Sequence, residues 1–447
     1  MQGKEYSIFT ALAMIIGTVI GSGIFFKADN ILEYTHGNVF LGVIIFVLAA
    51  FAIIFGSLSI AQLAMRTDKP GGLITYADEF VSRRAAGMMG WFQIFLYYPT
   101  LAVIVSWVVG VYVALLFGVQ DASLELQIGI GFGWLLVTYV MNMLSGRLGG
   151  KFQEFTTIVK LIPLFVLGIG AFIFGDPVGV FTAHPGGLIH TGGSSFGWLL
   201  AVGPIAYAFD GWVISTSIAH KIRNARRNLP LALSIAPLGI LLIYLVYLVG
   251  ISSYLGPERV MELGDTSVDL VAQGLFGETI AKAFLVFVVV SVMGTLNGLI
   301  LGFIHLPYSL AIRGLIPFKE KLSLVHKKYN MPLVSAVFSF VVVLFWMGIH
   351  YVVMKYDLLM GMDISEISIV VSYLLYVMFY YQVFRLWRKG VVKNIFFGCI
   401  APILATLGSV FILFGGVQNI VFLTVCLPIC FVVLFLAYRY TKSYKKD

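Results

Sequence analysis

The stretch GTVIGSGIFFKADNIL, residues 17–32, places three glycines inside an apolar run near the start of the chain. Residues 7–26 carry no charge and are about as long as the ~20 residues that a membrane-spanning helix needs. A glycine inside a helix lowers its stability by roughly 1 kcal/mol relative to alanine. Gly17 and Gly21 have the spacing at which small residues let two helices pack closely. The alternative is that the helix is broken at residues 21–23 for a functional purpose.

The composition of the whole chain predicts an all-α membrane protein. Of its 447 residues, 60% are hydrophobic and 11% are charged, whereas about 25% are charged in a typical soluble domain. Long stretches with at most one charge predict twelve transmembrane helices. They lie at residues 7–26, 39–65, 85–120, 126–146, 155–175, 191–220, 229–257, 283–312, 330–350 and 367–384, and in the two parts of 394–438 that GGVQN at 415–419 separates.

The basic residues predict the orientation of these helices. Most of the 29 lysines and arginines fall in segments on the same side as the amino terminus, and short basic loops are retained in the cytoplasm. We therefore expect a multi-pass protein of the plasma (inner) membrane, surrounded by the lipid bilayer, with both termini in the cytoplasm. The charges are spread over many loops and form no single basic face, so we expect no nucleic-acid partner.

The sequence offers little for an enzyme or a metal site. Cys399, Cys426 and Cys430 have no metal-ligand spacing, and the seven histidines form no HExxH motif. A P-loop is also missing from the sequence, which argues against an intrinsic ATPase. We therefore predict no metal, no cofactor and no enzymatic activity.

A second predicted span is interrupted in the same way as the first. The stretch PIAYAFDGW, residues 204–212, brings a proline, an acid and a glycine into the sixth span. Spans one and six hold the same place in two successive sets of five, which is the pattern of an inverted-repeat transporter with a site at the midplane. The pattern divides the chain into a first repeat at 1–175, a second repeat at 191–390, and two further spans with a basic tail at 391–447.

The physical chemistry of a broken helix favours an amino acid as the ligand. Unwinding a helix in lipid exposes N–H and C=O groups, each of which costs several kcal/mol unless it finds a partner. The carboxylate of an amino acid can accept hydrogen bonds at the positive N-terminal end of a half-helix, and its ammonium group can donate to the freed carbonyls. Glycine allows the close approach of backbone to ligand. We therefore expect the two breaks to form a binding site.

Four motifs in order along the chain resemble those of the amino acid–polyamine–organocation transporters, in particular the L-type amino acid transporter branch. They are GTVIGSGIF (17–25), KPGGLITYADEF (69–80), AYAFDGW (206–212) and NARRNLPLAL (224–233). The resemblance covers essentially the whole chain and is greatest to bacterial exchangers of small neutral amino acids such as serine, threonine and alanine. It implies a leucine-transporter-type fold and alternating access.

The resemblance also implies the residues of the substrate site. Amides of residues 22–24 would hold the carboxylate, and carbonyls of residue 20 and residues 207–210 would receive the amino group. Phe209 would act as an aromatic gate, and Tyr244 of the seventh span is placed in the pocket by alignment alone. The implied site comprises Ile20, Gly21, Ser22, Gly23, Ile24, Tyr207, Ala208, Phe209, Asp210 and Tyr244. Asp210 has an equal alternative role, which is to cap the exposed amides of the second half-helix.

Lys160 is the only charge between residues 155 and 175. Its side chain could reach back to the membrane interface, but an ionisable residue inside a membrane is by default functional. In sodium-coupled relatives of the implied fold a cation braces span one against span eight, and sodium-independent relatives have a lysine at this place. The resemblance therefore implies a coupling-cation site made of Lys160, Gly17, Ser291, Thr295 and Asn297.

The sequence departs from the family pattern near the predicted inner gate. Lys221 stands where the family usually has an acid, and Ala225 replaces the usual proline. A salt bridge of the inner gate must then be rebuilt or absent. In animal relatives a cysteine between spans three and four attaches an accessory glycoprotein. The corresponding loop, residues 118–126, contains no cysteine, so we expect no disulfide-linked heavy subunit.

The leading hypothesis is a sodium-independent exchanger of small neutral L-amino acids of the alanine, serine, threonine and cysteine type. The first alternative is proton-coupled uptake in which Lys160 titrates. A membrane-embedded enzyme is a more remote alternative, and His305 alone does not supply the polar constellation that it would need. A non-transporting receptor is equally remote, because no soluble signalling domain is recognisable in the sequence.

Overall fold

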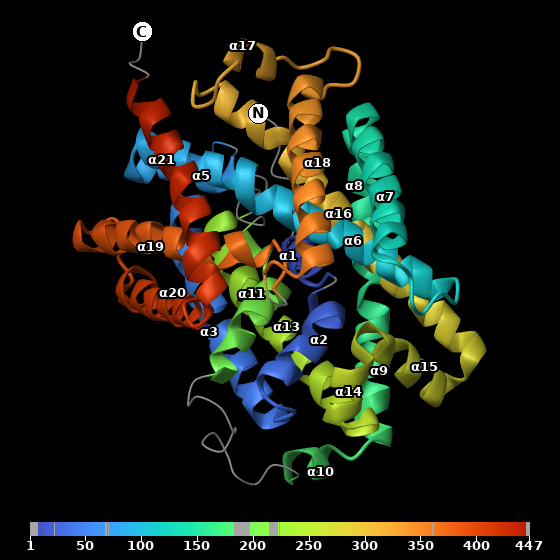
Figure 1. Cartoon of the computed structure of the whole chain (residues 1–447). Helices are drawn as coiled ribbons and strands as arrows, with labels where there is room; N and C mark the ends of the chain where they lie inside the picture. Colours follow the sequence, from blue (N-terminus) through green and yellow to red (C-terminus); the bar gives the residue numbers. More distant parts are fainter. Residues whose placement is uncertain are drawn as a thin grey trace.

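A computed structural model describes residues 8–21, 23–67, 69, 71–182, 197–213, 222, 224–359 and 362–443. In these residues the regular elements are helices, and an isolated β-bridge joins His326 and Met331 (Figure 1). Ten of the helices are long and apolar enough to cross a membrane. The predicted all-α membrane architecture is therefore confirmed.

The ten long helices follow one another along the chain. They are α3 (Val39–Ala64), α5 (Arg83–Phe92) with η2 (Gln93–Tyr97) and α6 (Tyr98–Leu116), α7 (Leu124–Leu144), α8 (Gly146–Val159) with α9 (Leu161–Phe174), α13 (Ala225–Leu255), α16 (Glu278–Ala311), α18 (Leu333–Tyr356), α19 (Glu366–Arg388), η7 (Phe396–Ile400) with α20 (Ala401–Gly416), and η8 (Phe422–Cys426) with α21 (Leu427–Ser443).

The first and sixth predicted spans are interrupted, and for this reason neither is among the ten long helices. The first consists of α1 (Ile8–Val19) and α2 (Gly23–Tyr34), each of 12 residues, and each about 18 Å long at 1.5 Å per residue. In the sixth, η4 (Gly197–Ala201) and α11 (Val202–Ala208) end before a turn at residues 209–211. Gly211 adopts φ +98° in this turn, a conformation that favours glycine. Both interruptions lie where the sequence predicts them.

The two interrupted segments pack together inside the ring of long helices. Helix α2 contacts α11, α1 contacts α13, and α13 also packs against α3 and α9. Helix α16 packs against α6 and α8 and also contacts α1. In Figure 1, α1 and α11 lie near the middle of the view, between α19 and α20 on one side and α7 and α8 on the other. The arrangement brings the two breaks close to each other.

The helix of the fifth span is irregular at one residue, although the sequence predicts no irregularity in it. Helix α8 ends at Val159 and α9 begins at Leu161, so Lys160 stands at the junction. Pro163 follows three residues later. It has no N–H to donate to the carbonyl of Val159, and its ring crowds that carbonyl. The irregularity turns a lysine inside the membrane toward the first span.

The outer surface of the long helices is apolar. Leu136, Val137 and Val140 on α7 are each more than 40% exposed, as are Phe165 and Ile169 on α9. A monomeric soluble protein rarely exposes such large contiguous apolar surfaces. The surface therefore fits contact with lipid chains, as expected of a multi-pass membrane protein.

Candidate functional site

A small cavity of about 40 Å³ lies at the two helix breaks. Five spans contribute to its wall. The lining residues are Gly17, Val19, Gly21 and Gly23 of the first span, Leu101 and Val105 of α6, Gln153 of α8, Tyr207, Asp210 and Gly211 of the sixth span, and Thr295, Gly298 and Leu299 of α16.

The cavity brings together part of the predicted substrate site. Gly21, Gly23, Tyr207 and Asp210 line it, and Ser22 lies outside the described residues. The remaining predicted residues are buried near the breaks but do not line the cavity. These residues are Ile20, Ile24, Ala208, Phe209 and Tyr244.

The glycines of the first break permit very close packing. A Cβ atom at Gly23 would lie 2.7 Å from the Cα of Ala208, and one at Gly21 would lie 2.7 Å from Oγ1 of Thr295. A Cβ at Gly17 would lie 2.5 Å from the side chain of Thr157. These glycines therefore meet the requirement for packing, and all three also place the backbone at the cavity. The two interpretations of the sequence do not exclude each other.

Tyr244 of α13 joins the two breaks. Its hydroxyl lies 2.8 Å from the carbonyl oxygen of Ala208 and 3.3 Å from that of Val19. Both carbonyls stand at ends of half-helices, where no intrahelical donor is available to them. The tyrosine is fully buried. It therefore positions the broken backbone and does not form the wall of the cavity.

Phe209 is held in an aromatic cluster in this conformation. Its ring centroid lies 5.1 Å from that of Tyr244 and 5.9 Å from that of Phe46, and the side chain is fully buried. Such tilted and edge-to-face arrangements are favourable for aromatic rings. The role of Phe209 as a gate stays a prediction.

Asp210 presents a carboxylate at the cavity. Its Oδ2 accepts a hydrogen bond of 2.5 Å from the hydroxyl of Tyr97. The other oxygen, Oδ1, is buried and has no hydrogen-bond partner among the described residues. A buried acceptor without a donor is costly, so Oδ1 is suited to receive a donor from a ligand.

Tyr97 was not predicted from the sequence. It lies in η2, a π-helical turn two residues before Pro99. Because Pro99 has no N–H, the carbonyl of Phe95 needs another donor, and Nε1 of Trp346 donates to it at 2.7 Å. A proline inside a long apolar run was the signal for this irregularity. π-Helical turns are frequent at functional sites.

Lys160 reaches the first span directly. Its Nζ donates to the carbonyl oxygen of Gly17 at 2.5 Å and lies 3.4 Å from Oγ1 of Thr295. The Thr295 hydroxyl in turn donates to the carbonyl oxygen of Ser291 at 3.1 Å. The side chain of Lys160 is fully buried. The structure thus places a cation between the first span and α16.

Asn297, the remaining member of the predicted cation site, makes a different set of contacts. Its side chain bonds to Gly149, Gln153 and Asn142 and not to Lys160. Gln153 lines the cavity and, like Tyr97, was not predicted from the sequence. It lies seven residues, or about two helical turns, before Lys160, so both fall on one side of the helix. This spacing from Lys160 is the sequence feature that could have indicated Gln153.

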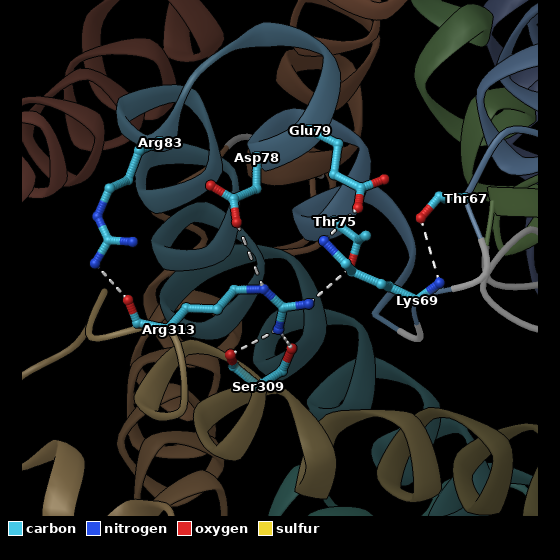
Figure 2. Close-up of polar contacts among 8 residues, drawn as sticks. All are labelled: Thr67, Lys69, Thr75, Asp78, Glu79, Arg83, Ser309 and Arg313. Carbon is cyan, nitrogen blue, oxygen red and sulfur yellow. Dashed lines mark hydrogen bonds and ion pairs between the residues drawn. The ribbon is translucent and has the colours of Figure 1, made fainter.

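An ion-pair network lies on the side where the sequence predicts the cytoplasm (Figure 2). The network joins the end of α16 to α4 (Gly72–Tyr76) and η1 (Ala77–Val81). The Arg313 guanidinium donates to Thr75 Oγ1 at 2.9 Å and lies 3.9 Å from a carboxylate oxygen of Asp78. Arg83 donates to the carbonyl oxygen of Arg313 at 2.5 Å.

A second ion pair of this network joins Lys69 and Glu79 at 2.8 Å. Partial burial tends to raise the pKa of Glu79, but hydrogen bonds from Lys69 and Thr67 and the charges of Lys69 and Arg313 together lower it. Glu79 is therefore ionised at neutral pH. Lys221, which replaces a usual acid near the predicted inner gate, lies outside the described residues.

Comparison with known proteins decides the family. Residues 6–440 match the family model of the amino acid permeases. The chain belongs to the amino acid permease family. This permease is 31% identical over 415 residues to the serine/threonine exchanger SteT of Bacillus subtilis, an alignment that covers 92% of the permease and 90% of the exchanger.

Two human relatives are more distant. The permease is 26% identical over 347 residues to the Asc-type amino acid transporter 1, covering 74% of the permease and 63% of that protein. It is 25% identical over 342 residues to the cystine/glutamate transporter, covering 75% of the permease and 66% of that protein. The permease thus spans about two thirds of the length of these two relatives.

The comparisons confirm the resemblance that the four motifs indicated. Membership of the family makes this chain a transporter and not an enzyme. Its ten long apolar helices make it a multi-pass membrane protein. The cavity at the helix breaks is therefore the candidate substrate site of a permease.

Proposed function

We propose that this permease exchanges small neutral L-amino acids of the alanine, serine, threonine and cysteine type across the plasma membrane by alternating access, without sodium. The contact between Lys160 Nζ and the Gly17 carbonyl oxygen, 2.5 Å long, carries the proposal. A protonated lysine in this place would supply a positive charge where a sodium-coupled transporter would need an ion. The exchange activity named for the Bacillus subtilis relative supports the same conclusion.

The two breaks would bind the part common to all amino acids. The substrate carboxylate accepts hydrogen bonds from the amides at the start of α2, at Gly23 and Ile24, where the helix dipole is positive. Its ammonium group donates to the carbonyls near residue 20 and residues 207–210 and to the unpartnered Oδ1 of Asp210. The amide of Ser22 completes this set in the proposal.

The architecture proposed for this function has twelve spans. The two broken segments complete the ten long helices, with residues 1–175 and 191–390 as inverted repeats and residues 391–447 as an addition. Both termini lie in the cytoplasm, as the basic loops indicate. The short loop between α6 and α7 contains no cysteine, so the permease works without a disulfide-linked heavy subunit.

Lys160 would act as a brace between the first span and α16. Its ammonium group satisfies the Gly17 carbonyl, which lies just before the break, and approaches Thr295 on α16. Alternating access requires this contact to form and release while the charge stays in the protein. Because no ion is taken from solution, the sodium gradient supplies no energy for transport.

Proton-coupled uptake is the second candidate, and one observation favours it. The buried Lys160 has no carboxylate partner among the described residues. Burial without an opposite charge favours the neutral amine. Loss of a proton during the cycle would weaken the hydrogen bond to the Gly17 carbonyl and couple transport to a proton gradient.

Counterflow into liposomes tests exchange. Purified permease is reconstituted into vesicles that contain either serine or no amino acid, and uptake of radiolabelled serine is measured. We expect uptake into serine-loaded vesicles to be at least tenfold faster than into empty vesicles, because only a loaded site returns across the membrane. Equal rates in the two preparations would exclude exchange and leave uniport or coupled uptake.

A further inference from the structure

A chain of side-chain amides lies beside the cavity, and its orientation is determined by two backbone carbonyls. The Nδ2 of Asn297 donates to the carbonyl oxygen of Gly149 at 3.0 Å, and the Nδ2 of Asn142 donates to that of Thr138 at 2.9 Å. A carbonyl can only accept, so each of these amides must turn its NH₂ group toward its carbonyl. The Oδ1 of Asn297 then accepts from Asn142 at 2.9 Å.

The same series of hydrogen-bonded amides determines the orientation of the Gln153 side-chain amide. The Nδ2 of Asn297 also donates to Oε1 of Gln153 at 3.2 Å. The carbonyl end of the glutamine amide therefore faces Asn297, and its NH₂ group is turned away from it. Within the described part of the chain, no hydrogen bond joins Nε2 of Gln153 to a protein acceptor.

The free NH₂ group of Gln153 borders the cavity. Gln153 and Gly298 both line it, and a Cβ atom at Gly298 would lie 3.2 Å from Oε1 and 3.3 Å from Nε2 of the glutamine amide. The missing side chain at Gly298 thus leaves the amide uncovered on that side. Nearby lining residues Leu101, Val105 and Leu299 offer no polar side-chain atoms, and the hydroxyl proton of Thr295 is already donated to Ser291.

We propose that Gln153 is a specificity-determining residue, and that its Nε2 donates a hydrogen bond to the side-chain hydroxyl oxygen of serine or threonine. Asn297 is the residue that positions it. The inference rests on the proposed function, because it takes the cavity as the site of a small amino acid. Alanine has no acceptor for this donor, so the site prefers serine to alanine.

The experiment compares serine with alanine as competitors of labelled threonine exchange in wild-type permease and in Gln153→Leu. Leucine has a similar size and no donor. We expect the preference for serine over alanine to fall by roughly 3- to 10-fold, the effect of one neutral hydrogen bond. The matched control is Gln382→Leu on α19, a glutamine that does not line the cavity, for which the ratio should not change.

A second variant covers the case in which Gln153→Leu does not fold. Gln153→Glu keeps the acceptor for Asn297 but presents a carboxylate oxygen to the cavity instead of an amide donor. Serine can still donate its hydroxyl proton to this oxygen, whereas O-methylserine can only accept. We therefore expect O-methylserine to weaken relative to serine by a similar factor in this variant.

The outcomes separate the two claims. A wild-type protein that exchanges neither serine nor alanine overturns the proposed function and this inference with it. If the wild type exchanges both, an unchanged serine-to-alanine ratio in Gln153→Leu, or equal weakening of serine and O-methylserine in Gln153→Glu, overturns the role of Gln153 alone. Equal loss of both substrates would assign Gln153 a structural role.

Discussion

Replacing Gly23 by valine is expected to abolish amino acid exchange. Even a single Cβ atom at this position would lie 2.7 Å from the Cα of Ala208, a backbone atom that cannot move aside alone. The valine side chain would also enter the space in front of the amides at the start of α2, where we place the substrate carboxylate. We expect counterflow of serine to fall at least a hundredfold, because both the contact between the breaks and the carboxylate site are lost.

The matched control for this variant is Gly133→Val on α7. A Cβ at Gly133 has no atom within 4 Å, so the substitution adds the same side chain at a glycine with open space around it. Detergent-solubilised protein should give a single peak on size exclusion for both variants. Wild-type exchange by a well-folded Gly23→Val protein would contradict the assignment of the first break to the substrate site.

Replacing Lys160 by alanine is expected to remove most of the exchange activity. The variant leaves the Gly17 carbonyl without its donor in a fully buried place. An unsatisfied buried group costs about 1–3 kcal/mol, which corresponds to a loss of roughly 5- to 150-fold. The same deletion also removes the link to Thr295 on α16, so the rate of counterflow should fall within or beyond this range.

Two further variants make the result specific to the buried charge. Lys160→Met keeps a long flexible side chain without the ammonium group, and it should lose as much activity as the alanine variant. Lys151→Ala removes an exposed lysine from the same helix, α8, and should keep wild-type rates. Activity of Lys160→Met close to wild type would show that the lysine side chain only fills space and that its charge is not needed.

The sequence predicted the two breaks because spans one and six, at matching places in two sets of five, are each interrupted. Gly21, Gly23 and Asp210 stand out in long apolar runs, and the lack of water in lipid makes any break there significant. The contact of Lys160 with Gly17 also follows an expectation from the family resemblance. This contact could be predicted because Lys160 is the one charged residue in an otherwise uncharged span and needs a polar partner.

Other parts of the site depend on packing that local sequence does not reveal. The bond from Tyr97 to Asp210 joins residues 113 positions apart, and tyrosines are common in such a chain. Asn297 was expected near Lys160 and instead lies in the amide chain with Gln153 and Asn142. The side of the helix on which Asn297 projects was decided by its contact with α7 and α8, which sequence spacing alone does not fix.

The ion dependence of serine counterflow tests most directly whether Lys160 takes the place of a transported cation. Wild-type permease in serine-loaded liposomes is assayed with sodium chloride and with choline chloride at the same pH, each with and without a protonophore. If Lys160 takes the place of a transported cation, the four rates should agree. A requirement for sodium would contradict the account, and in empty liposomes an uptake that the protonophore abolishes would assign Lys160 to proton coupling instead.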